Sequence, residues 1–375
     1  MLKTPPGTTG VLAHQHLLEA IGDGIIDAGR FKIPTENVQP ASLDLSLDET
    51  AYRLRCSFLP DTRSVEAKRA ELTIDELDLH GAGAVLETGR PYLIPLKERL
   101  DLPPNVRGKA NPKSSTGRID VFTRVITDES YRFDEIEAGY RGGLYLEVVP
   151  LSFPIRVRED LTLNQLRLAV GHPELTDADV GRLHAAAPLL YKGAKPVPDE
   201  DLALANGLFL SLDLRGDASG RVGYRARTSP PLLDLTAAAP APAEQYWESV
   251  RREDGDRIVL SPNVFYLLMS DEAVVIPPTL AAEMTAYDPT SGELRTHYAG
   301  FFDPGFGYDA RGQFTGSRAA LEVRAHDVPF MIEHGQRVCK LTFERMLEPP
   351  EALYGETGSS YQRQVDTLSK YFTAG

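Results

Sequence analysis

The sequence repeats itself in order, and the two copies lie roughly 170 residues apart. The offset between matched segments is 169 at the first pair, 174 at the second and 175 at the third, a slow increase typical of short loop insertions. Short strand patterns often resemble one another, but three matches in one order favour a duplicated domain over chance. The matched segments are PASLDLSLDE at 40–49 with LFLSLDLRGD at 208–217, RLDLPPNV at 99–106 with AVVIPPTL at 273–280, and GGLYLEVVPLSFPIRV at 142–157 with SRAALEVRAHDVPFMI at 317–332.

The repeated segments read mostly as strands. Stretches such as LYLEVV, IRVR and VCKLTF are short, rich in β-branched or aromatic residues, and separated by Gly, Pro and Asp. This pattern predicts a mainly β fold with two barrels or sandwiches in tandem. Only a few short helices are expected, the clearest near 14–28 and near 177–187, where Thr176 or Asp177 could cap the helix.

The length of 375 residues is enough for two ordinary cores. We predict a first barrel at 1–172, a helical and Pro-rich connector at 173–200, and a second barrel at 201–375. The segment TAAAPAPAE at 236–244 is expected to be a loop inside the second copy.

Composition excludes several classes of function. The formal net charge is −14 with acidic and basic residues interleaved, so we expect no nucleic-acid partner. The apolar stretches are shorter than a membrane span and the N-terminus has no signal-peptide core, so we expect a cytoplasmic protein with no membrane partner. Cys56 and Cys339 stand alone, which predicts two buried thiols and neither a disulfide nor a structural zinc site.

The segment NPKSSTGRID at 111–120 places two hydroxyls, Ser114 and Ser115, between the cations Lys113 and Arg118. In isolation, such a decapeptide is most simply a solvated turn capped by serines. The second copy, however, has Tyr-Asp-Pro at 287–289 and Gly292 at the matching positions. A polar set retained in one copy only indicates a functional site in the first copy.

Four parts of the chain form a recognisable set: VRGKANPKSSTGRIDV, the later GYRGGLYLEVV with Glu147, the earlier QPASLDLSL, and the tail SSYQRQVDTLSKYF at 359–372. Together they resemble the dCTP deaminase family. The family has an Arg-Ser-Ser-x-x-Arg segment, a Gly-x-Leu-Glu strand and a tail with spaced Tyr, Gln and Ser. The resemblance implies two distorted β-barrels of the kind shared with the dUTPases, the second of them degenerate.

Deamination of cytosine requires attack of water on C4, protonation of N3 and departure of ammonia. Zinc deaminases activate the water with a His-x-Glu and Cys-x-x-Cys ligand set, which this chain lacks, so no zinc is expected and a carboxylate must activate the water. Glu147 follows Leu144, Tyr145 and Leu146 on an apolar strand, and a carboxylate there is a candidate general base. The resemblance implies that Glu147 is that base; alternatively, Glu147 simply faces solvent from an alternating strand.

The resemblance also assigns roles to the segment around the two serines. Ser114 is similar to the serine that positions the attacking water, and Arg118 to the arginine that binds near the reacting ring. Lys113 and Ser115 are similar to residues that contact the phosphates.

The remaining substrate contacts are also implied by the resemblance. Asp134 is similar to the aspartate that binds the deoxyribose 3′-hydroxyl, and Gln165 to a strand glutamine of the family. In the tail, Tyr361 would cover the base and Gln364 would reach the phosphates.

The implied reaction is hydrolysis of dCTP to dUTP and ammonia, with Mg²⁺ bound through the nucleotide phosphates. Because active sites of the family lie where barrels meet around a threefold axis, we expect a homotrimer. Two other functions stay open: a dUTPase-like or bifunctional enzyme that also removes pyrophosphate, and a non-catalytic pyrimidine nucleotide sensor.

Overall fold

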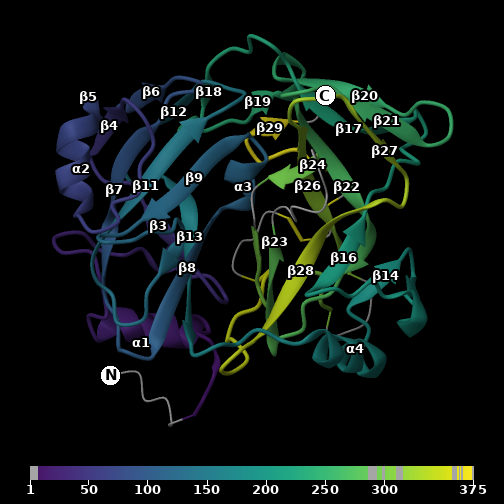
Figure 1. The fold of residues 1–375 in the computed structure, drawn as a ribbon, viewed down its shortest axis with the longest axis horizontal. Helices are drawn as coiled ribbons and strands as arrows, with labels where there is room; N and C mark the ends of the chain where they lie inside the picture. The colour runs from purple at the N-terminus through teal and green to yellow at the C-terminus, as the bar shows by residue number, and fades with distance from the viewer. Residues whose placement is uncertain are drawn as a thin grey trace. The chain divides into compact units, whose positions relative to one another are not determined.

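The computed structural model describes residues 7–285, 294–297, 300–309, 316–356, 361, 362, 364 and 366–373 (Figure 1). The chain folds into two compact units. Unit 1 consists of residues 1–173 and 229–241, and unit 2 consists of residues 174–228 and 242–375. Strands dominate both units, so the prediction of a mainly β fold is confirmed.

Unit 1 is built from two large sheets and one small sheet. Its strands are β1 Gly10–Val11, β2 Ile26–Asp27, β3 Leu43–Ser46, β4 Thr50–Leu54, β5 Thr73–Asp78, β6 Ala84–Leu86, β7 Tyr92–Asp101, β8 Val106–Pro112, β9 Val121–Ile126, β10 Glu135–Ile136, β11 Arg141–Pro150, β12 Ile155–Val157, β13 Thr162–Val170 and β18 Leu233–Asp234. One large sheet has the order β1-β13-β8-β10, with β3 on β13. The other has the order β5-β4-β7-β11-β9, with β2 on β7, and the small sheet has the order β18-β12-β6.

Unit 2 repeats this plan. Its strands are β14 Leu190–Lys192, β15 Lys195–Pro196, β16 Leu208–Ser211, β17 Arg221–Ala226, β20 Trp247–Arg251, β21 Arg257–Leu260, β22 Phe265–Val274, β23 Leu280–Thr285, β24 Leu294–His297, β25 Gly300–Phe302, β26 Ser317–Ala325, β27 Phe330–Glu333 and β28 Arg337–Arg345, and two further short strands are β19 Ala241–Pro242 and β29 Phe372–Thr373. The order β16-β28-β23-β25 matches β3-β13-β8-β10 of unit 1. The path β20-β17-β22-β26-β24 matches β5-β4-β7-β11-β9.

The strand register identifies the residues that correspond in the two units. Glu147 on β11 lies opposite Leu93 on β7 and Arg124 on β9. In the same way, Glu322 on β26 lies opposite Leu267 on β22 and His297 on β24. The two glutamates are therefore counterparts, as the third matched pair of segments predicts.

The first matched pair of segments has a different register from the predicted one. Strand β3 pairs with β13 as β16 pairs with β28, so Ser46 corresponds to Ser211 and the offset is 165 instead of 169. The backbone N–H groups of these serines donate to two buried carboxylates, Glu98 at 2.9 Å and Glu272 at 2.8 Å. The predicted alignment was wrong by four residues because a shift by an even number keeps every side chain on its face of the strand.

The helices are short. They are α1 His14–Gly22, α2 Val65–Leu72, α3 Ser114–Gly117 and α4 Asp177–Ala186, and the 3₁₀ turns are η1 Thr35–Asn37, η2 Asp199–Asp201 and η3 Ala243–Gln245. Helix α4 confirms the second prediction, because Thr176 caps it and forms a capping box with Asp179. Helix α1 ends earlier than the predicted 14–28, because Gly24 takes a φ of 73° and the chain continues into β2.

Two connecting segments lie elsewhere than their sequences suggested. Most of the expected connector belongs to unit 2, where β14 pairs with β22. The segment 229–241 belongs to unit 1, where the N–H of Leu233 donates to the carbonyl of Pro154 at 2.9 Å. The prediction of a loop inside the second copy was therefore wrong for most of 236–244. Burial of Leu233 and Leu235 beside β12 explains the difference.

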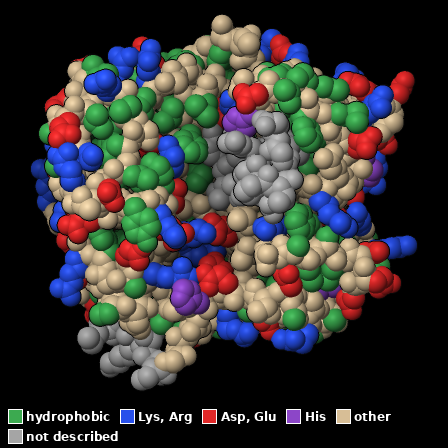
Figure 2. All heavy atoms as spheres, viewed as in Figure 1, with side chains coloured by type: hydrophobic (Ala, Val, Ile, Leu, Met, Phe, Trp, Pro, Cys, Tyr) green, Lys and Arg blue, Asp and Glu red, His purple; other side chains and the backbone are tan. Residues whose placement is uncertain are grey.

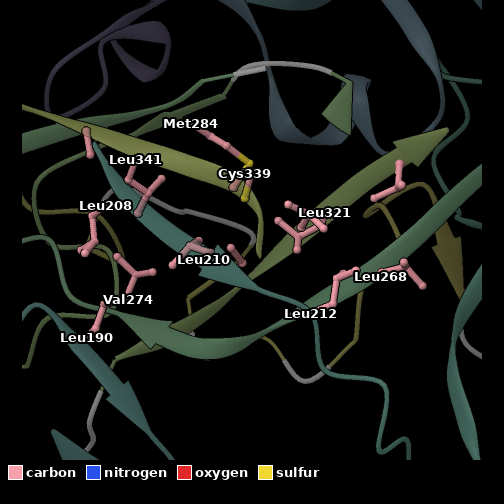
Figure 3. Packing of buried hydrophobic residues seen from close by; sticks show 14 of the residues in the cluster. Leu190, Leu208, Leu210, Leu212, Leu268, Val274, Met284, Leu321, Cys339 and Leu341 are labelled. Atoms are coloured by element: carbon pink, nitrogen blue, oxygen red, sulfur yellow. The ribbon is translucent and has the colours of Figure 1, made fainter. Parts of the chain in front are cut away.

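The core of unit 2 shows how its sheets pack (Figure 3). Leu210 on β16, Leu268 on β22, Leu321 on β26 and Leu341 on β28 are all fully buried. Cys339 lies in this cluster, and burial raises the pKa of its thiol. Cys56 is exposed, so the prediction of two buried thiols was right for Cys339 only. Among the described residues, no helix is long and apolar enough to cross a membrane.

Candidate active site

The two serines lie in a buried turn between β8 and β9. Lys113 is the N-cap of α3, its carbonyl accepts from the N–H of Thr116 at 2.8 Å, and the N–H of Arg118 donates to the carbonyl of Ser114 at 3.1 Å. Ser115 and Arg118 are only 4% and 3% exposed. Burial of a hydroxyl and a guanidinium is costly unless they are bound, so a simple solvated turn does not explain this segment.

The turn lies where the two large sheets of unit 1 meet (Figure 1). Helix α3 packs against β9 and against β13. Strand β9 pairs with β11, which carries Glu147, and β13 carries Gln165. The fold thus gathers the segment 113–118, Glu147 and Gln165 on neighbouring elements of one unit, as a common site requires.

Glu147 is fully buried on β11, with buried Leu146 and Val148 on either side. Its Oε1 accepts two hydrogen bonds from Arg124, at 2.8 Å from Nη2 and 3.2 Å from Nε. Its Oε2 is also buried and has no hydrogen-bond partner among the described residues. The alternative that Glu147 faces solvent from an alternating strand is therefore wrong. One of its oxygens is held by Arg124, and the other accepts no hydrogen bond from the described residues.

Lys113 forms an ion pair inside the same unit. Its Nζ donates to the carboxylate of Asp44 on β3 and to Oγ1 of Thr162, the latter at 2.8 Å. The side chain of Lys113 is one-fifth exposed. The charge of the Lys113 ammonium is therefore already partly neutralised by Asp44. Its contact with a phosphate stays a prediction.

Asp134 ties two strands together. Its Oδ1 accepts from the N–H of Val125 on β9 at 2.7 Å, and its carbonyl accepts from the N–H of Ala110 on β8 at 2.8 Å. This places Asp134 beside the residue that follows Arg124. Gln165 lies opposite Asn111 on β8, and its Oε1 accepts from Oγ of Ser42 at 3.3 Å.

The two tail residues belong to unit 2. Tyr361 accepts through its hydroxyl from the N–H of Lys370 at 3.2 Å, and Gln364 donates to the carbonyl of Arg318. Gln362, which sequence reasoning did not single out, donates to the carbonyl of Gly305 at 2.9 Å and accepts from the N–H of Gly307 at 2.9 Å. The start of the predicted tail, residues 359–360, lies outside the described residues.

A polar cleft of about 190 Å³ in unit 2 lies beside this tail, between Arg221, Tyr224 and Arg318. The hydroxyl of Tyr224 donates to Asp366 at 2.9 Å. Burial raises the pKa of Tyr224 to about 12, so the phenol keeps the proton that it donates. Farther on, the ring of Phe372 lies 5.8 Å from that of Trp247 in an edge-on arrangement. These contacts fasten the end of the chain to unit 2.

Sequence reasoning missed Arg124 and Asp44, which bind Glu147 and Lys113. Each is a charged residue within a mostly apolar strand segment, LDLS for Asp44 and VFTRVI for Arg124. Such a residue can belong to a buried ion pair. The partner, however, depends on which strands lie side by side. The matching positions of the second copy, 287–289 and Gly292, lie outside the described residues.

Two groups of described residues could hold a metal ion, and neither includes a predicted site residue. Each group contains one histidine and two carboxylates: Glu49, His80 and Glu159 in unit 1, and Asp213, Asp271 and His334 in unit 2. In the second group, Arg318 binds Asp213 at 2.7 Å and Lys192 binds Asp271 at 3.1 Å. On the face drawn in Figure 2, described Lys and Arg side chains are interspersed with Asp and Glu.

Comparison with known families and structures gives one consistent result. The family model "2'-deoxycytidine 5'-triphosphate deaminase (DCD) N-terminal domain" matches residues 8–172, and the model of the C-terminal domain matches residues 176–372. The crystal structure of 2'-deoxycytidine 5'-triphosphate deaminase from Agrobacterium tumefaciens is similar, with a TM-score of 0.85 and 45% identity over 92% of this chain and 100% of that chain.

Curated relatives match shorter parts of the chain. A dCTP deaminase from Natronomonas pharaonis is 30% identical over 195 residues, which cover 51% of this chain and 90% of that protein. A "dCTP deaminase, dUMP-forming" from Methanobrevibacter smithii is 32% identical over 126 residues. That match spans 32% of this chain and 60% of the relative's length.

Proposed function

Because the chain belongs to the dCTP deaminase family, we propose that it hydrolyses dCTP to dUTP and ammonia. The observation that carries the proposal is Glu147, a fully buried carboxylate with one oxygen bound by Arg124 and the other without a partner among the described residues. A sensor would need to bind the nucleotide but would have no need of a water-activating base.

The reaction can be written with the residues of unit 1. Oε2 of Glu147 takes a proton from a water whose oxygen bonds to C4 of the cytosine. The carboxyl passes that proton to N3, then takes the remaining proton from the new C4 hydroxyl and passes it to the amino group. The C4–O bond becomes a carbonyl as the C4–N4 bond breaks with its electron pair on nitrogen, and ammonia leaves. Ser114 orients the water and Arg118 binds beside the ring, where its charge stabilises the addition intermediate.

Substrate binding follows from the same assignment. Lys113 and Ser115 contact the triphosphate, which carries Mg²⁺, and Asp134 binds the 3′-hydroxyl of the sugar. Gln165 lines the site from β13, and Tyr361 and Gln364 close over the base and phosphates. No protein-bound zinc takes part in this mechanism. We place the enzyme in the cytoplasm, as a homotrimer that supplies dUTP for pyrimidine deoxynucleotide synthesis.

A bifunctional enzyme is the second candidate, since several relatives bear the name "dCTP deaminase, dUMP-forming". Such an enzyme also cleaves the bond between the α- and β-phosphates and releases pyrophosphate. The two candidates share the deamination step and differ in their final product.

One experiment tests the proposal and separates the candidates. Purified protein is incubated with dCTP and Mg²⁺, and ammonia, dUTP, dUMP and pyrophosphate are followed together. Equal amounts of ammonia and dUTP support a deaminase, whereas ammonia with dUMP and pyrophosphate supports the bifunctional enzyme. Binding of dCTP without release of ammonia would refute both and favour a sensor. Zinc at one atom per chain in elemental analysis would refute the zinc-independent mechanism.

A further inference from the structure

We propose that Arg124 is a positioning residue for Glu147. Arg124 holds one oxygen of the Glu147 carboxylate, so that the other oxygen serves as the proton acceptor. The inference rests on the proposed function, because it assigns a role in the deamination step. It adds a residue that lies outside the segment 111–120 and that acts only through the base.

The geometry of the pair is unusual for an arginine and a carboxylate. A guanidinium commonly binds both oxygens of a carboxylate through two parallel hydrogen bonds. Here Nη2 and Nε of Arg124 both donate to Oε1 of Glu147, at 2.8 and 3.2 Å. Oε2 therefore stays unpartnered among the described residues, although it is fully buried. A buried acceptor without a donor is costly, and a bound water would satisfy it.

Arg124 is itself held in place by two aromatic rings. The carbon at the centre of the group lies 3.9 Å from the ring centre of Phe133 and 4.4 Å from that of Phe122. Nη2 also lies 3.4 Å from Oγ of Ser57. Two aromatic contacts and the contact with Ser57, all independent of Glu147, limit the freedom of the side chain, so it can fix the orientation of Glu147.

The duplicated unit supplies an internal comparison. Unit 2 keeps the glutamate as Glu322, but the residue opposite it is His297 instead of an arginine. Packing of the fold alone therefore does not demand an arginine opposite this glutamate. The arginine occurs in the unit that also carries Ser114 and Arg118, which links it to the chemistry of that unit.

The position of Arg124 also separates it from the predicted phosphate contacts. It lies on β9, opposite Glu147 on β11, whereas the predicted phosphate contacts lie at the start of α3. Loss of the guanidinium should therefore impair turnover more than binding. Misplacement of a reacting group by about 1 Å can cost roughly 100-fold in rate.

The test compares four variants with the wild type under steady-state conditions with dCTP and Mg²⁺. Arg124→Gln should lower kcat by roughly 10- to 100-fold with a much smaller change in KM. Phe133→Leu, which removes one aromatic contact but keeps the guanidinium, should lower kcat by a smaller factor. Arg124→Ala should regain part of its kcat when guanidinium ion is added at millimolar concentration. The matched control is Arg63→Gln, which breaks an exposed pair with Glu71 in the same unit.

The outcomes separate this inference from the proposed function. A wild-type protein that releases no ammonia from dCTP would overturn both. An active wild type whose Arg124→Gln variant keeps its full kcat, or turns over faster, would overturn only the role of Arg124. A rise in the KM of the Arg124→Gln variant with unchanged kcat would also overturn it, since that pattern is typical of a lost substrate contact. If Arg124→Gln fails to fold, Phe133→Leu decides: an unchanged kcat counts against the inference.

Discussion

Replacement of Glu147 by glutamine should abolish most of the activity while the protein still folds. The amide keeps the volume of the side chain, and its oxygen can still accept from Arg124. It cannot take a proton, so a general base is lost. General acid–base catalysis contributes about 10²- to 10⁴-fold, which corresponds to about 2.7–5.5 kcal/mol of barrier.

The cost to stability should be much smaller. Glu147 is fully buried, but the side chain of Arg124 is one-quarter exposed, so water already screens the pair. The variant exchanges a charged acceptor for a neutral one without leaving Arg124 unpaired, a loss of about 1–2 kcal/mol. Affinity for dCTP should change little, because the predicted phosphate and sugar contacts lie on other elements.

Three measurements check this prediction: ammonia release at saturating dCTP, dCTP binding by calorimetry, and thermal unfolding. Glu322→Gln is the matched control, since Glu322 is the buried counterpart in unit 2. It should leave turnover nearly unchanged. Turnover of the Glu147→Gln enzyme within about tenfold of wild type, a loss of only about 1.4 kcal/mol, would refute the assignment of the base. An equal loss of activity in the Glu322→Gln enzyme would refute the view that unit 2 is catalytically degenerate.

Three further predictions concern stability, closure and assembly. Burial raises the pKa of Glu98 to about 7 from 4.5, so the folded state retains a proton that the unfolded state releases. Stability should therefore fall as pH rises from about 4.5 to 7, by at most about 3 kcal/mol. In thermal melts, the Glu98→Gln variant should lose this pH dependence, whereas the exposed control Glu137→Gln should keep it. Deletion of residues 359–375 should lower turnover without changing the oligomeric state, and full activity after deletion would contradict a closing role for the tail. Light scattering should give about 120 kDa, the mass of three 41.2 kDa chains, and an active monomer would contradict the trimer.

The sequence was sufficient to predict the fold class, because apolar and polar residues alternate along the strands and turn residues separate them. It was not sufficient for register: the first repeat was misaligned by four residues, because LDLS and LFLS fit the same alternating pattern. Helix α3 was not predicted, since a single turn is stabilised by its burial between β9 and β13 and not by helix propensity.

The candidate site was predictable only in part for a similar reason. The segment 111–120 stands out because its polar residues are adjacent in the chain. Arg124 and Glu147 are 23 residues apart and meet only because β9 and β11 pair. A single sequence does not specify that pairing, so the base could be proposed but its partner could not.

The two units allow structural and functional buried charges to be told apart. Glu98 and Glu272 occupy corresponding positions, and each accepts a hydrogen bond from the N–H of the corresponding serine, so this buried carboxylate belongs to the architecture of the fold. A glutamate is also present at both positions 147 and 322, and by itself it therefore does not distinguish an active site. The distinction lies in what surrounds it: unit 1 places an arginine opposite the carboxylate and a buried Ser-Ser-x-x-Arg turn against the neighbouring strand. Unit 2 places a histidine at the first of these positions. Activity should therefore follow the partners of the glutamate and not the glutamate alone.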